Sequence, residues 1–182
     1  VGLGENASFV NAAAGEFDHF NNYYFTAVTG NLAVNFLSPL SSTFTPSSFY
    51  IGKLSGVSIL SGGTGALSPS YVKLYTTDPN VTAYFTSLAT SITLSTAVNT
   101  GLRDFIYEQT TNLLATYVTF PDPSNPSQFM GQMLKVNPAT GEVKSVAPAV
   151  VLPFVNSSVE MAGTFIDKDG KFLILFSDGT MY

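Results

Sequence analysis

The chain contains no cysteine and no tryptophan, and its single histidine is His19. Without cysteine, neither disulfides nor thiolate metal sites can contribute to the fold. No apolar run reaches the roughly 20 residues that a membrane-spanning helix needs. The longest run, Ala147–Val155, is far shorter and includes two prolines. We therefore expect no membrane span.

Charged residues are also scarce. They make up 10 % of the 182 residues, beside 45 % apolar residues, whereas ordinary soluble domains are about 25 % charged. The net charge of −5 leaves no basic surface for a phosphate backbone, so we expect no nucleic-acid partner. Between Asp18 and Asp78 only Lys53 and Lys73 are charged. A soluble monomer usually carries charges of both signs over its surface, so this region has the composition of a surface that another molecule covers.

Short apolar stretches separated by turn residues recur along the chain and predict β-strands. Met161–Ile166 alternates, Asp167–Gly170 has the composition of a turn, and Lys171–Phe176 continues as a second strand. Further turns are predicted at Thr110–Asn112 and at Asn137–Gly141. The pattern predicts an all-β fold, an antiparallel β-sandwich or barrel (jelly-roll-like) built from consecutive hairpins with little helix. A fragment of a β-propeller is the alternative. The length predicts a single domain over residues 1–182.

Three other segments carry expectations about local structure. Residues 17–37 predict a hairpin that turns at Thr29–Asn31. The proline-rich segments 38–48 and 120–127 are expected to be loops. Val81–Val98 is ambiguous, because Val81, Tyr84, Phe85 and Leu88 have helical spacing after Asp78 and Pro79, a good N-cap and first position. Its Thr and Ser content and the neighbouring strands favour strand over helix.

The N-terminal residues 1–14 have two readings. Gly2 and Gly4 allow a flexible start, and Ser8–Val10 forms a short strand-forming core. The segment could be an arm that pairs with a neighbouring subunit by strand addition. The alternative is an ordinary first strand that pairs within its own domain, and this is the interpretation that we favour.

No catalytic residue, metal site or cofactor site is predicted. Asp18 adjoins His19, but neighbours on a strand point to opposite faces, and no nucleophile motif is present. Asp167, Asp169 and the more distant Asp178 resemble the start of a calcium loop but lack the distal glutamate of an EF-hand. Turn conformation alone explains these aspartates. Gly62–Gly65 lacks the Lys-Ser/Thr of a phosphate-binding loop. We therefore expect the protein not to be an enzyme.

Two kinds of surface site are worth examining. Three acceptor sequons for N-glycosylation begin at Asn6, Asn80 and Asn156, although chance alone predicts about two or three such triplets in this composition. The aromatic residues of Phe17–Tyr24 could form a platform for stacking sugars if they are exposed, whereas burial would make them core.

The composition favours a non-enzymatic structural subunit that assembles with copies of itself into an extracellular filament, tube or surface layer, or into a virion. The alternative is an adhesin or carbohydrate-binding β-sandwich module. The chain begins at Val1, which removal of a signal peptide would explain, as would a shorter fragment. An extracellular or cell-surface location is therefore expected.

Overall fold

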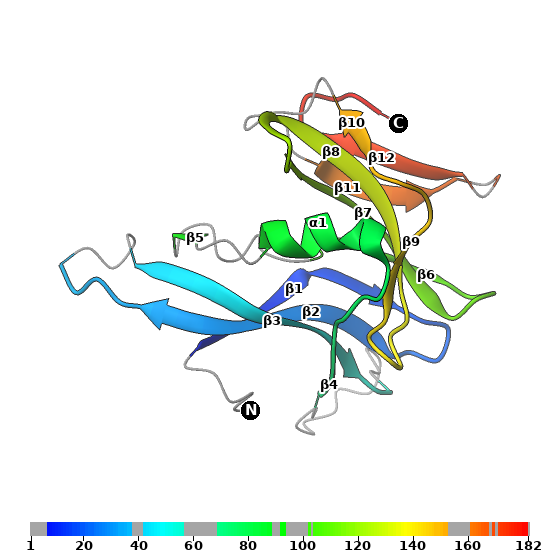
Figure 1. Cartoon of the computed structure of the whole chain (residues 1–182). Coiled ribbons are helices and arrows are strands. Elements are labelled where there is room, and N and C mark those ends of the chain that lie inside the picture. The colour runs from blue at the N-terminus through cyan, green and yellow to red at the C-terminus, as the bar shows by residue number, and fades with distance from the viewer. Residues whose placement is uncertain are drawn as a thin grey trace.

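A computed structural model describes residues 7–37, 42–56, 69–88, 92–93, 102, 104–152, 161–167, 169 and 171–181. For residues 7–14, 92–93, 161 and 166 it describes the backbone only. The described chain is mostly strand, with one helix, α1 (Pro79–Leu88). Its strands form antiparallel sheets from consecutive hairpins (Figure 1), which confirms the predicted all-β, sandwich-like fold with little helix. Within the described chain neither large sheet closes on itself.

The first sheet is a meander in the order β1-β2-β3-β4, and β5 pairs with the start of β3. Its longest hairpin, formed by β2 and β3, reaches far to the left in Figure 1. The strands span Ala7–Phe17 (β1), Tyr23–Ala33 (β2), Thr43–Leu54 (β3), Ser70–Lys73 (β4) and Ile92–Thr93 (β5).

The second sheet has the order β10-β8-β7-β6, and β9 pairs with the same long strand β8. One edge of β8 is thus shared by β9 and β10, while β7 lies along the other. A separate hairpin, β11–β12, follows at the C-terminal end. The strands span Ile106–Glu108 (β6), Leu113–Asp122 (β7), Asn125–Val136 (β8), Val143–Ser145 (β9), Val150–Leu152 (β10), Met161–Ile166 (β11) and Phe172–Phe176 (β12).

The main core lies between the two large sheets and includes one face of α1 (Figure 1). Val28 and Ile51 come from the first sheet, Leu114 and Leu134 from the second, and Val81 from the helix. Each such side chain stabilises the fold by about 1.5–3 kcal/mol when fully buried. A smaller cluster joins β12 to β10, with Leu152, Ile174 and Phe176 at its centre.

The helix α1 contradicts the strand predicted from Val81 onward. An Asp78 carboxylate oxygen accepts the backbone N–H of Asn80 at 2.9 Å, and Pro79 occupies the first helical position. Val81 and Tyr84, three residues apart, bury the same face. Two of the hydroxyls that lower helix propensity bond back to carbonyls one turn earlier. The cap and the apolar spacing therefore outweigh the weak propensity of Thr and Ser.

The hairpin predicted over residues 17–37 is also wrong, because β2 continues through Thr29–Asn31. The turn lies at residues 18–22, where Asn21 takes a positive φ of 60°. Asp18 fixes this turn by accepting backbone N–H groups of Phe20 and Asn22, each at 2.9 Å. Gly30 serves packing instead, since a Cβ there would overlap the carbonyl oxygen of Thr45.

Both proline-rich segments expected to be loops contribute to strands. Pro46 lies in β3 opposite Gly30, and Pro121 lies in β7 opposite Phe129. Each is next to a register shift in the ladder. A proline lacks the N–H that regular pairing uses, so strands tolerate it at such irregularities. The segment 120–127 is consequently a tight hairpin between β7 and β8 instead of a long loop.

The three predicted hairpin turns are present. Thr110–Asn112 joins β6 to β7, and Asn137–Gly141 joins β8 to β9. Of the turn predicted between β11 and β12, Asp167 and Asp169 are described, while Lys168 and Gly170 lie outside the described residues. Asn112 and Gly141 take positive φ values of 56° and 81°. The Asp167 carboxylate accepts the N–H groups of Asp169 and Lys171 at 2.9 and 2.8 Å. At these turns the local residue types were therefore sufficient to predict the structure.

The N-terminal strand follows the ordinary alternative. Ala7–Asn11 pairs antiparallel with Gly30–Thr26 of β2 in the same chain, as expected for an ordinary first strand. The backbone groups of these residues that face β2 therefore find partners within the domain. Residues 1–6 lie outside the described residues.

Replacing Gly141 by alanine should destabilise the fold more than replacing Gly179. Both glycines have positive φ, so each alanine should cost about 1–2 kcal/mol of unfolding free energy. Only at Gly141 would the new Cβ overlap the carbonyl oxygen of Lys73, whereas nothing lies within 4 Å at Gly179. We expect Gly141→Ala to lose about 1–3 kcal/mol more. Urea denaturation measures the difference, and equal losses would contradict the close approach.

Candidate interaction surface

The residues that sequence analysis examined for catalysis do not form a catalytic site. Asp18 is 6 % exposed and accepts hydrogen bonds from Asn22 and Tyr24. His19 is exposed and its ring contacts that of Phe20, with 3.8 Å between ring centroids and a tilt of 43° between the planes. Burial raises the pKa of Asp18, but the hydrogen bonds outweigh it and leave the pKa below its usual value. The carboxylate therefore stabilises its own turn.

The three aspartates examined for calcium also have local roles. Asp167 accepts two N–H groups within its turn, and Asp178 accepts the N–H of Thr180 at 2.8 Å. In the part of the chain that the structure describes, no group of three or more Asp, Glu, His or Cys residues is placed to hold a metal ion. Gly62–Gly65 lies outside the described residues.

Of the three sequon asparagines, only Asn80 lies in the described chain, where it is exposed in the first turn of α1. Asn6 and Asn156 lie outside it. The aromatic stretch Phe17–Tyr24 is divided: Phe17 and Phe20 are exposed, but Tyr24 and the next residue, Phe25, are buried. Of the four aromatic residues in Phe17–Tyr24, two are therefore exposed, Tyr23 is half-buried and only Tyr24 is core. No helix among the described residues is long and apolar enough to cross a membrane.

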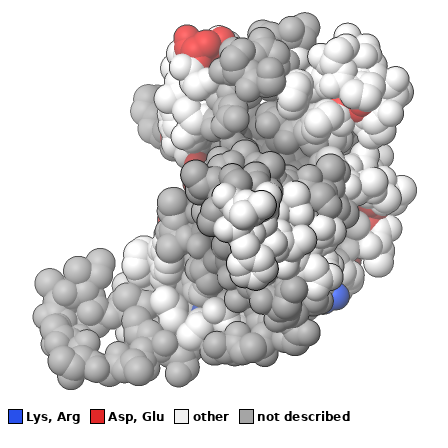
Figure 2. Space-filling model, turned by 90° about the vertical axis from the view of Figure 1, so that its left-hand side faces the viewer, with Lys and Arg blue, Asp and Glu red and all other residues white. Residues whose placement is uncertain are grey.

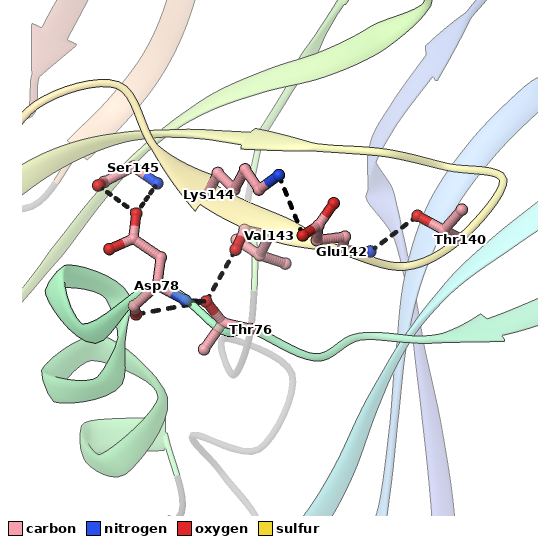
Figure 3. A network of polar contacts seen from close by, with 7 residues as sticks. All are labelled: Thr76, Asp78, Thr140, Glu142, Val143, Lys144 and Ser145. Carbon is pink, nitrogen blue, oxygen red and sulfur yellow. Dashed lines mark hydrogen bonds and ion pairs between the residues drawn. The ribbon is translucent and has the colours of Figure 1, made fainter.

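A polar network links the two large sheets (Figure 3). Asp78 accepts the backbone N–H and the hydroxyl of Ser145 at 2.9 and 2.5 Å, and the Thr76 hydroxyl donates to the carbonyl of Val143 at 2.8 Å. Tyr75 and Glu142 form a parallel bridge between the same segments. The bonds from Ser145 and Asn80 hold the pKa of Asp78 at about 2. The network joins residues 75–78 to β9 and the turn before it, and its role is structural.

Exposed apolar side chains gather at the end of the β2–β3 hairpin. Val34, Phe36 and Leu37, here called the apolar tip, are 49 %, 88 % and 98 % exposed. The backbone of the tip is nevertheless fixed. The N–H of Asn35 donates to the Ser42 hydroxyl at 2.9 Å, and the N–H of Leu37 donates to the Asn35 side-chain oxygen at 3.1 Å. The hairpin therefore holds these apolar side chains in water.

The apolar tip lies in a part of the chain without charge, since no Lys, Arg, Asp or Glu occurs between Asp18 and Lys53. Figure 2 views the molecule from the side toward which the hairpin extends. The described atoms there are mostly uncharged, with acidic atoms chiefly at the top and basic atoms at the lower right. An uncharged surface loses little hydration energy when another molecule covers it.

The low charge between Asp18 and Asp78 indicated a covered surface in this region, but the predicted hairpin over residues 17–37 placed the tip residues in a strand after the Thr29–Asn31 turn. The adjacent apolar pair Phe36 and Leu37 breaks the alternation of apolar and polar residues that a half-buried strand would have. This pair, inside an uncharged segment, was the available signal.

Comparisons with protein-family models, curated proteins and solved structures give no match.

The stability contributed by Asp78 should depend on pH. Its folded pKa of about 2 lies below the ordinary 3.8, so the contribution is present above about pH 4 and is lost as the pH falls toward 2. Asp78→Asn should therefore lower the melting temperature most near neutral pH, and the gap to the wild type should narrow in acid. Ser145→Ala should act in the same direction, because the Ser145 hydroxyl is the largest cause of the low pKa. Melting curves between about pH 2 and 7 test this, and a gap that is constant over pH would contradict it.

Proposed function

We propose that the protein is a non-enzymatic structural subunit that assembles with copies of itself, and that the apolar tip is one of its contact surfaces. The observation that carries the proposal is the fixed exposure of Phe36 and Leu37 within an uncharged segment. Large apolar side chains that cluster on an exposed surface favour an interaction site.

The energetics favour burial of the tip. Covering Phe36 and Leu37 would supply about 1.5–3 kcal/mol for each side chain. Their backbone is already held by the Ser42 and Asn35 bonds, so little ordering remains to be done on association. No like charges in this segment would oppose the approach of identical subunits.

The proposal extends to an extracellular or cell-surface filament, tube or layer, or to a virion component. Asn80 is exposed, so a glycan there on the natural protein would be a direct sign of export. Release of mass by an N-glycosidase, followed by mass spectrometry, would detect it.

Carbohydrate binding, the alternative, has less support. It depended on exposed aromatic side chains over Phe17–Tyr24, and the burial of Tyr24 and partial burial of Tyr23 leave only Phe17 and Phe20 exposed there.

Replacing Phe36 and Leu37 together by serine should weaken assembly without unfolding the protein, since both side chains are exposed. The loss of about 3 kcal/mol or more of apolar burial should weaken association at least about a hundredfold. Size-exclusion chromatography with light scattering over a micromolar concentration series measures this.

The matched control is Phe20→Ser, which removes a phenylalanine that is 66 % exposed at the β1–β2 turn. This variant should assemble as the wild type does. A wild-type protein that stays monomeric, or equal behaviour of the two serine variants, would contradict a role for the tip.

A further inference from the structure

The two edges of the first sheet differ. At one edge, β4 is only four residues long, ends in Lys73 and leads directly into the segment that is bonded to β9. At the other edge, β1 spans 11 residues and, among the described strands, pairs only with β2. The β4 edge is thus short and is followed by a segment bonded to the second sheet, while the outer row of N–H and C=O groups of β1 has no strand partner among the described residues.

Proteins usually protect an edge strand with a short length, a lysine, a proline or a bulge. β1 has no lysine, arginine or proline, and its one charged residue is Glu16 near its end. Its register shift lies between Asn11 and Glu16, so Ala7–Asn11 keeps regular pairing with β2. This five-residue stretch is an unprotected template for another strand.

The composition of β1 favours a second copy of itself as that strand. When two copies pair antiparallel about a twofold axis, each residue lies opposite itself or a near neighbour of the same strand. Any charge near the axis would therefore meet a like charge, which is destabilising. From Ala7 to Gly15 the strand has no charged residue, so no like charges would meet near the axis.

We propose that two copies of the chain join through the Ala7–Asn11 edges of β1, antiparallel and about a twofold axis near Phe9, into one continuous sheet. This inference rests on the proposed self-assembly and adds a second contact to it. Since β4 at the other end of the same sheet is only four residues long and ends in Lys73, it is a poor template for a further strand, and edge pairing would stop at two copies. Growth beyond the dimer then requires another surface, which is the role that we give to the apolar tip.

The natural absence of cysteine allows a direct test. The test uses the double variant in which Phe36 and Leu37 are replaced by serine, which should be a dimer. In this variant a single cysteine replaces, in turn, Ala7, Ser8, Phe9, Val10 and Asn11. Each step away from the axis separates equivalent residues by about 7 Å, since both strands advance by about 3.4 Å. Disulfide formation on mild oxidation should therefore peak sharply at Phe9 or an adjacent position. The matched control is Ser124→Cys in the exposed β7–β8 turn.

The expected peak rate exceeds that of the Ser124 control by roughly a hundredfold, because paired strands hold their thiols at millimolar effective concentration. Equal crosslinking at all five β1 positions would indicate parallel pairing and would overturn the proposal. Rates at or below the control, or a monomeric tip variant, would overturn it and leave the role of the tip intact. A tip variant that assembles as the wild type does would instead contradict the proposed function of the tip, and the cysteine scan would still decide the β1 contact.

Discussion

The carboxylate of Asp78 stands at the junction of the two large sheets, and the arrangement of the molecule depends on it. One oxygen caps α1, and the other accepts two hydrogen bonds from Ser145 of β9. A single side chain thus fixes where the helix begins and where the second sheet lies against it. A negative charge at this end also matches the positive end of the helix dipole. The Tyr75–Glu142 bridge and the close approach of Gly141 to Lys73 hold the same junction from the backbone side.

The core that this junction closes is formed by three parts of the chain. α1 places Val81 and Tyr84 between the sheets, so that the helix and both sheets share one apolar cluster. On the far side of the second sheet, Asp104 accepts the N–H and the hydroxyl of Thr164 at 2.8 and 2.9 Å and ties β11 to it. Each layer is therefore joined to the next by an aspartate as well as by apolar contact.

The sequence predicted those features whose cause is local. The Asn137–Gly141 turn was predicted because Asn and Gly select that conformation whatever surrounds them. Gly30 was misread because its reason is the nearby Thr45 carbonyl and the ring of Phe44, which only the paired strands bring close. The apolar tip could not be placed for a related reason: whether Phe36 and Leu37 face core or water depends on where β2 ends. The helix is an exception, because its Asp78 cap and apolar spacing are local, but the Thr and Ser content and the neighbouring strands favoured a strand in the prediction.

The topology of the molecule has a consequence for how the chain folds. Within each large sheet most pairing joins strands that are consecutive in the sequence, so loop closure within a meander is short and fast. The bonds between residues 76–78 and β9 instead span 67 positions. We therefore expect each meander to form early and the docking of one on the other to limit the folding rate. Until that docking the inner faces of both sheets are open to water, so the burial of the core depends on the step that is slowest to occur.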